Sequence, residues 1–228
     1  MSSLFLLINA PLCDILKLNF VCMGENMGGY AEVLKRLKQS FGVTFPFYEG
    51  DPYKVLISCI LSARSRDERT YPTANKLFEK YHGPCQLAEA KLEDVQDILR
   101  HLGLWREKSK RVIDAAKVIC ELGYVPDTFE ELTKIPGIGR KCAHIVLAYG
   151  FGKRVVAVDT HVRRISKRLG IVPTDAKDEE IEQAWLSVLG DDAKDINHYL
   201  VALGRRLCGR TPKCNECPLN DICKKQGV

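Results

Sequence analysis

The sequence predicts an all-α protein, and two observations support this fold class. Apolar residues recur at intervals of three and four along most of the chain, the spacing of one face of a helix. The only β-like run is 154–158 (RVVAV), and no candidate partner strand accompanies it. Of the 228 residues, 46% are hydrophobic, so we expect a packed interior in one large domain or two small ones.

About ten helices are expected, each bounded by Gly, Pro or Asp. The helix at 51–63 begins with an Asp-Pro cap and is apolar almost all round, which predicts a central, buried position. The run from Thr128 to Ile135 leads into a glycine turn that separates the earlier helices from the later ones. The expected helices, in order, are 30–41, 51–63, 71–81, 91–103, 106–123, 128–135, 140–152, 160–170, 178–190 and 195–208.

The first 26 residues carry an apolar stretch that superficially resembles a secretory signal. The stretch lacks a basic start and a small-residue cleavage site, and Asn9, Pro11 and Asp14 interrupt it. It is also too short and too polar to span a bilayer. We therefore expect 1–26 to be a loosely ordered extension, an ordered domain that begins near Met27, and no membrane partner.

Charge is distributed unevenly along the chain, whose net charge is +5. From Lys134 onward there are 17 Lys and Arg residues against 11 Asp and Glu residues, a net charge of +6. A basic C-terminal half suits a polyanionic partner, although a solvated basic face is the more common cause of such an excess.

Ten cysteines fall into two groups. Six are scattered singly, mostly in apolar runs, where we expect them to pack as small hydrophobic residues. The six are Cys13, Cys22, Cys59, Cys85, Cys120 and Cys142. The other four crowd together near the C-terminus, which favours a local metal site in an intracellular protein over a disulfide framework.

Cys208, Cys214, Cys217 and Cys223 form the pattern C-x5-C-x2-C-x5-C. Four thiolates this close in sequence can ligate either zinc or a [4Fe–4S] cluster. Zinc sites usually pair two separated C-x2-C units, whereas this run has one short gap between two equal longer gaps. The spacing therefore favours iron–sulfur.

A second motif lies at 132–143 (LTKIPGIGRKCA), which has the pattern of a helix–hairpin–helix. Ile138 should anchor the hairpin in the core, and Gly137 and Gly139 allow a tight turn that a phosphate can approach closely. Backbone N–H groups at the start of the next helix, with Arg140, would bind the anion without reading base sequence. Many tight helix turns carry Gly-x-Gly, so the glycines alone do not establish that the turn binds phosphate.

Lys141 follows in the first turn of the outgoing helix, where a cation is electrostatically disfavoured and a lowered pKa is expected. A neutral amine is a nucleophile. From position alone, a solvated lysine that contacts phosphate is the simpler interpretation. Asp159, at the end of an apolar run, is either a helix N-cap or a functional carboxylate, and His161 is either a first-turn residue or a phosphate contact.

The hairpin, the stretch VVAVDTHVRRISKRLG and the four-cysteine loop, in this order and spacing, resemble the endonuclease III family of helix–hairpin–helix DNA glycosylases. The resemblance runs from about Tyr30 to Cys223. It implies a two-lobed helical DNA glycosylase fold with a C-terminal iron–sulfur loop. Residues 43–153 would form a six-helix barrel domain, and 27–42 with 154–228 would form a domain that carries a structural [4Fe–4S] cluster.

The resemblance also implies a reaction. Lys141 would attack C1′ of a damaged pyrimidine nucleotide, and Asp159 would help to activate the amine and stabilise positive charge on the sugar. Leu104 and Arg64 would enter the space that the extruded base vacates. Arg64 stands where the family often has Gln, and the first cysteine gap is one residue shorter than usual.

These features predict a bifunctional glycosylase and AP lyase for oxidised pyrimidines, acting as a monomer on double-stranded DNA with a damaged base or abasic site. We expect it in the cytoplasm, associated with the nucleoid. A mismatch-thymine or uracil glycosylase of the same superfamily is the nearest alternative, although the mismatch-thymine branch generally lacks a lysine at position 141. A non-catalytic DNA-binding module is the alternative from another class.

Overall fold

The computed structural model describes residues 27–42, 48–65 and 67–228, and within these ranges it is entirely helical. The predicted all-α class is therefore confirmed. The α-helices are α1 (Met27–Ser40), α2 (Pro52–Ser62), α3 (Asp67–Lys80), α4 (Pro84–Ala88), α5 (Leu92–Leu99), α6 (Trp105–Leu122), α7 (Phe129–Leu132), α8 (Arg140–Ile145), α9 (Thr160–Leu169), α10 (Asp178–Leu189) and α11 (Ile196–Arg206). A π-helix η3 (Val146–Gly150) continues α8, and two 3₁₀ segments, η4 (Gly190–Asp195) and η5 (Cys214–Glu216), lie near the C-terminus.

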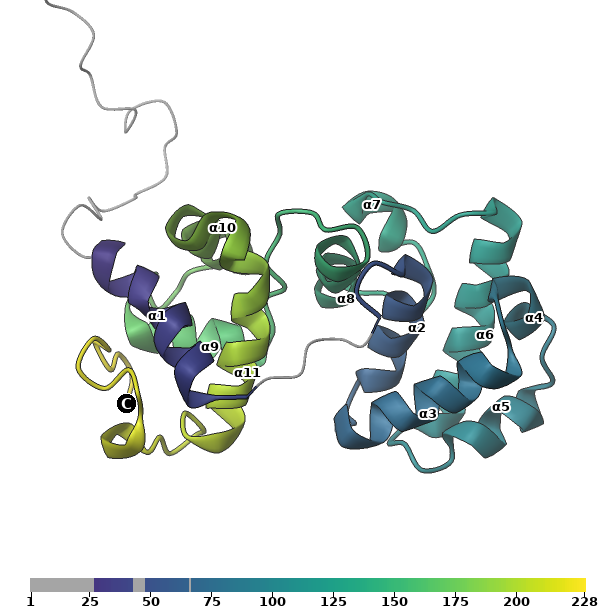
Figure 1. Cartoon of the computed structure of the whole chain (residues 1–228), viewed down its shortest axis with the longest axis horizontal. Helices are drawn as coiled ribbons and strands as arrows, with labels where there is room; N and C mark the ends of the chain where they lie inside the picture. Colours follow the sequence, from purple (N-terminus) through teal and green to yellow (C-terminus); the bar gives the residue numbers. More distant parts are fainter. Residues whose placement is uncertain (1–26, 43–47, 66) are drawn as a thin grey trace, which may run out of the picture.

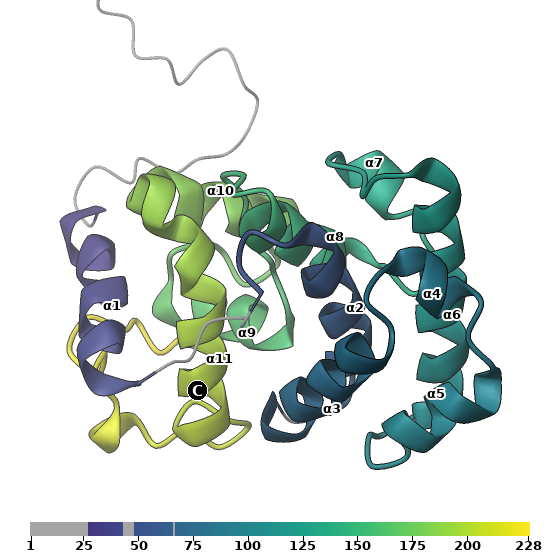
Figure 2. The same ribbon diagram turned by 45° about the vertical axis from the view of Figure 1, so that its right-hand side comes forward.

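The helices form two lobes, which are separated in both views of the molecule (Figure 1, Figure 2). One lobe contains α2 to α8 around a core that runs from Val55 to Ala157 in the sequence. The other contains α1, α9, α10, α11 and the C-terminal segment, and its core runs from Tyr30 to Phe41 and from Val156 to Leu219. The two cores are consistent with the predicted division into a domain at 43–153 and a domain made of 27–42 and 154–228, and this division stays a prediction. The predicted extension at 1–26 lies outside the described residues.

Helix α2 is the central element of the first lobe. The Asp51 side chain accepts a hydrogen bond from the Lys54 N–H, and Pro52 occupies the first turn, so the predicted Asp-Pro cap is confirmed. Seven consecutive residues, Val55 to Leu61, are buried. Gly150 lets η3 approach the start of α2, because a Cβ there would lie 2.8 Å from Pro52 Cα. The segment that carries α8 and η3 is thereby packed against α2.

Several predicted elements differ from the structure. The helix expected at 71–81 begins at Asp67, and the one expected at 140–152 divides into α8 and η3. The short helix α4 was not predicted, because its five residues are fewer than two turns and give no periodic signal. Residues 154–158 pair with no strand in the described chain; their buried members Val156, Ala157 and Val158 contribute to the cores instead. No helix of the described residues is long and apolar enough to cross a membrane.

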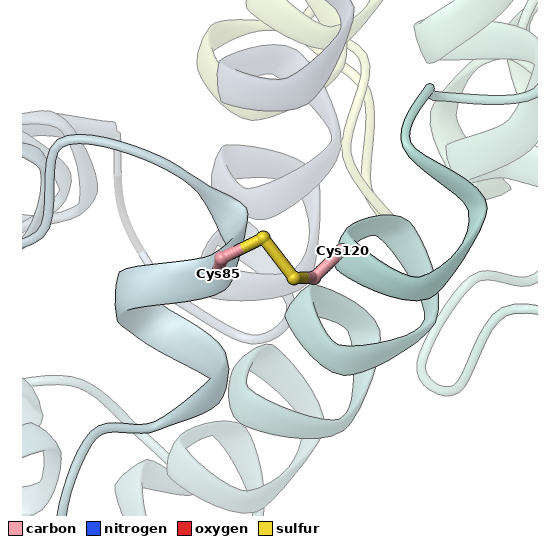
Figure 3. Close-up of a disulfide and its surroundings, with 2 residues drawn as sticks. All are labelled: Cys85 and Cys120. Atoms are coloured by element: carbon pink, nitrogen blue, oxygen red, sulfur yellow. A yellow bond between two sulfur atoms is a disulfide. The ribbon is translucent and has the colours of Figure 1, made fainter.

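Two of the cysteines expected to pack as single thiols are covalently linked. Cys85 on α4 and Cys120 on α6 form a disulfide across a sequence separation of 35 residues (Figure 3). The prediction was wrong for this pair because nothing local in the sequence indicates that a short helix after Gly83 lies against the end of α6. Cys13 and Cys22 lie outside the described residues.

Removal of this disulfide should destabilise the first lobe. Closing a loop of 35 residues lowers the entropy of the unfolded chain, which corresponds to about 3–4 kcal/mol of stability. We expect the Cys85→Ser/Cys120→Ser double variant to unfold at lower urea concentration than the oxidised protein. Reduced wild-type protein is the matched control, and it should unfold at the same urea concentration as the double variant. Coincident curves for oxidised and double-variant protein would contradict the prediction.

Candidate functional site

A cleft of about 1130 Å³ lies between elements of the two lobes. Its walls include residues of α2, α3 and α8 from the first lobe, and of α9 and α11 from the second. Four candidate residues from the sequence line this one cleft: Arg64, Lys141, Asp159 and His161. The structure thus brings together a predicted nucleophile and its predicted carboxylate, although 18 residues separate them in the chain.

Lys141 is the second residue of α8, whose N-cap is Gly139. Its charge acts on other groups of the cleft. It disfavours the protonated ring of His161 and favours the thiolates of Cys142 and Cys59, although the hydrogen bond to Cys142 and burial raise the pKa of Cys59 overall. For His161, burial is the largest cause of the lowered pKa, and Asp159 opposes it by favouring the protonated ring. The ammonium of Lys141 is therefore close enough to the imidazole to act on it electrostatically.

Asp159 is the N-cap of α9, and its Oδ1 accepts hydrogen bonds from the N–H groups of His161 at 2.8 Å and Val162 at 2.9 Å. The same side chain lines the cleft. Because the cap uses Oδ1, the second oxygen is not needed for it. The two interpretations of Asp159 are thus compatible: the cap orients the carboxylate, and the cleft exposes it to a substrate.

The hairpin has the backbone that its glycines predict. Gly137 has a φ of +86°, a left-handed conformation that favours glycine, and a Cβ there would lie 3.2 Å from Arg111 Cβ. A Cβ on Gly139 would meet nothing within 4 Å, so this position faces open space. Ile138 is buried and its N–H bonds to the Ile135 carbonyl, which makes it the predicted anchor of the turn. Phosphate binding by this hairpin stays a prediction.

Arg140 is engaged within the protein. Its guanidinium lies 2.8 Å from Glu179 Oε1 and 3.5 Å from Glu182 Oε2, and it lies over the Phe129 ring at 5.4 Å. These contacts connect α8 to α10. A phosphate would have to compete with two carboxylates for this side chain, so the predicted DNA contact of Arg140 remains untested.

The two predicted wedge residues belong to adjacent loops. Arg64 has a φ of +52° and Leu104 a φ of +58°, and both side chains are exposed, Leu104 to 43%. Left-handed backbone at a leucine is unusual and is often associated with function. A Cβ on Gly103 would lie 2.9 Å from the Arg64 carbonyl oxygen, so the loops are in backbone contact.

Lys108 ties these loops together and was not singled out from the sequence. It is 1% exposed, and its Nζ donates a hydrogen bond to Ser65 Oγ at 2.7 Å. Burial lowers its pKa to about 8. The sequence did contain a sign that Lys108 is buried. Lys108 lies four residues before Val112, and this spacing places it on the apolar face of the helix predicted at 106–123.

Because Lys108 is buried, the free energy of unfolding should change with pH in a defined direction. Its folded pKa lies below that of an unfolded lysine, so between pH 8 and about 10.5 the unfolded chain binds more protons and stability rises with pH. Relative to the Lys108→Met variant, the free energy of unfolding of the natural protein should therefore increase across that range. Urea unfolding of both proteins at a series of pH values measures the difference. A constant difference would contradict the burial of a titrating amine.

The four C-terminal cysteines surround one small region of the second lobe. The pKa of Cys217 is raised by burial and by the nearby charges of Cys208, Cys223 and Cys214, so all four thiols are electrostatic neighbours. Arg168 organises the loop. Its guanidinium donates to Cys208 Sγ at 3.4 Å and to the Gly209 and Arg210 carbonyls at 2.6 and 3.2 Å.

This donor set fits a [4Fe–4S] cluster. Four thiolates are its usual protein ligands, and a guanidinium that donates to a ligand sulfur offsets the negative charge of the complex. Within the described ranges, no group of three or more His, Cys, Asp or Glu side chains is arranged to hold a single metal ion. When bound, the cluster would hold the C-terminal loop in place.

Comparison with known proteins defines the class of this fold and site. The profile of the HhH-GPD superfamily of base excision DNA repair proteins matches residues 57–190, and that of the iron–sulfur binding domain of endonuclease III matches 209–223. Endonuclease III of Thermotoga maritima is 45% identical over 85% of this chain and 89% of the relative. Endonuclease III of Bacillus subtilis is 36% identical over 81% and 88%.

Solved structures agree with these matches. A trapped endonuclease III–DNA covalent intermediate superposes with a TM-score of 0.76 at 30% identity, covering 87% of this chain and 96% of that one. A thermostable thymine-DNA glycosylase, at 20% identity and a TM-score of 0.79, shares the fold. The chain belongs to the endonuclease III family of the HhH-GPD superfamily. It is a base excision DNA glycosylase with AP lyase activity, and it carries a [4Fe–4S] cluster.

Proposed function

We propose that Lys141 is the nucleophile of this glycosylase and lyase, that Asp159 is its carboxylate partner, and that the substrates are oxidised pyrimidines in double-stranded DNA. The observation that carries the proposal is that both side chains line one cleft between the lobes. The neutral amine of Lys141 attacks C1′, the base leaves, and a Schiff base forms. β-Elimination then cleaves the strand on the 3′ side of the sugar.

Asp159 acts through its negative charge. A carboxylate whose Oδ1 is held by two backbone N–H groups is fixed in place before the substrate arrives. From there it stabilises the positive charge that develops on the sugar as the base departs, and it helps to remove the proton of the attacking amine.

The damaged nucleotide must leave the helix to reach Lys141, because C1′ is shielded inside a duplex. Arg64 and Leu104 are exposed on touching loops and would fill the vacated space. The hairpin at Gly137 and Gly139 would hold the phosphate backbone, together with the basic second half of the chain. We infer that one copy of the chain suffices, since one chain contributes every group named, and that it works in the cytoplasm on nucleoid DNA.

Borohydride trapping tests the proposal. The protein is mixed with a duplex that contains an oxidised pyrimidine, and separately with duplexes that carry uracil or a mismatched thymine. We expect a covalent protein–DNA adduct with the oxidised base and strand cleavage in the absence of borohydride. An adduct confined to the uracil or thymine duplex would transfer the assignment to the alternative glycosylase. Binding without any adduct would overturn Lys141 as nucleophile.

A further inference from the structure

Two thiols lie against each other in the wall of the cleft. Cys59 on α2 and Cys142 on α8 have their Sγ atoms 2.6 Å apart, and both residues line the cleft. A disulfide bond measures about 2.05 Å, so the sulfur atoms need only a small approach to become bonded. The two residues are 83 apart in the sequence, and the packing of α8 and η3 on α2 brings them together.

The two thiols differ in their ease of ionisation. The hydrogen bond from Cys59 is the largest cause that lowers the pKa of Cys142, and the charge of Lys141 lowers it further against the effect of burial. The pKa of Cys59 is raised well above its ordinary value, by that same hydrogen bond and then by burial. Exposure agrees with these directions, because Cys142 is partly exposed to the cleft and Cys59 is buried behind it.

We propose that Cys59 and Cys142 form a redox-active dithiol, which a hydroperoxide oxidises to a disulfide that joins α2 to α8 beside Lys141. The Cys142 thiolate attacks the terminal oxygen of the peroxide, the O–O bond breaks, and Cys142 becomes a sulfenic acid while the rest of the peroxide leaves as hydroxide or alkoxide. Cys59 then attacks the sulfenic sulfur and displaces its oxygen, which leaves as water with the thiol proton. Two thiols are oxidised by two electrons, and one peroxide is reduced.

Among the cysteines of the described chain, Cys59 and Cys142 are the two that are available to form a new disulfide. Cys85 and Cys120 are already joined to each other, and the four C-terminal cysteines are the proposed cluster ligands. Cys59 and Cys142 remain as thiols; Cys142 is partly exposed and Cys59 is buried, and both line the cleft, so a small peroxide in the cleft would meet Cys142 first.

Oxidation should also change the environment of Lys141, a consequence that rests on the proposed function. Attraction between the Cys142 thiolate and the Lys141 ammonium is mutual, so the thiolate favours the protonated, unreactive amine. The disulfide removes that negative charge. The pH at which Lys141 forms a trapped adduct should then be lower in the oxidised protein than in the reduced protein.

Peptide mapping tests the dithiol directly. Cluster-loaded protein that keeps the Cys85–Cys120 disulfide and has free thiols at Cys59 and Cys142 is treated with limiting hydrogen peroxide, alkylated and digested with trypsin. We expect the peptides 55–64 and 142–153 to appear as one linked species that has lost two hydrogens, and dithiothreitol to separate them. If peroxide oxidises Cys142 to the sulfinic acid, or oxidises other thiols first while Cys59 stays free for alkylation, the proposal is overturned.

Two matched variants separate the dithiol from the proposed catalytic role. Cys59→Ala and Cys142→Ala each remove one sulfur, so neither can give the linked peptide, while the link between Cys85 and Cys120 remains as an internal standard. Borohydride trapping across pH is then compared for oxidised and reduced wild-type protein and for Cys59→Ala. A profile that shifts to lower pH only in the oxidised wild type supports the coupling to Lys141, and identical profiles overturn it. If the linked peptide formed but no form of the protein gave a trapped adduct, the proposed function would be wrong and the dithiol proposal would still hold.

Discussion

The Lys141→Gln variant should form no borohydride-trapped adduct and should lose at least about a thousandfold in strand cleavage at an oxidised pyrimidine. Glutamine has nearly the length and shape of lysine but lacks a nucleophilic amine, so the Schiff base cannot form. Duplex binding should remain nearly intact, because the hairpin and the basic surface are unchanged. Adduct formation, single-turnover cleavage and duplex affinity are the three measurements.

A matched control separates chemistry from charge. Lys134→Gln removes the same positive charge from an exposed position just before the hairpin, and it should retain the adduct. Both variants should show the same modest loss of affinity if charge alone matters for binding. Cleavage that persists in Lys141→Gln would identify another group as the nucleophile.

The sequence predicted those features whose signals are local. The Asp-Pro start of α2 and the glycine turn each rest on residues within one turn, and the structure has both. The iron–sulfur interpretation of the cysteine spacing is confirmed by the match to the iron–sulfur binding domain at 209–223. The fold class followed from the same local periodicity. Asp159 was left with two alternatives, because a single carboxylate at the end of an apolar run fits both, and only its place in the cleft makes them compatible.

Features that depend on contacts between distant elements were not predicted. The disulfide of Cys85 and Cys120 and the thiol pair of Cys59 and Cys142 join residues whose side chains meet only after the helices pack. Lys108 was missed for a related reason: its partner Ser65 is 43 residues away, and a lysine near the start of a helix is ordinarily solvated. The engagement of Arg140 by Glu179 and Glu182 likewise depends on α10, which approaches α8 from the other lobe.

The Asp159→Asn variant tests whether the carboxylate has a role beyond the cap of α9. Asparagine caps a helix as well as aspartate, so the variant should keep the stability of the natural protein. It removes the negative charge, and base release measured in a single turnover should fall by about 10²–10⁴-fold. Urea unfolding of the same preparation gives the stability.

Asp159→Ala completes the comparison, because it removes the charge and the cap together. This variant should lose activity as Asp159→Asn does and in addition about 1 kcal/mol of stability, since the N–H groups of His161 and Val162 lose their acceptor. If Asp159→Asn kept the natural rate, the carboxylate would be only a cap, and the nucleophile would need another group to accept its proton. Loss of rate at unchanged stability assigns the carboxylate to the reaction, because asparagine keeps the cap but lacks the negative charge and the second acceptor oxygen.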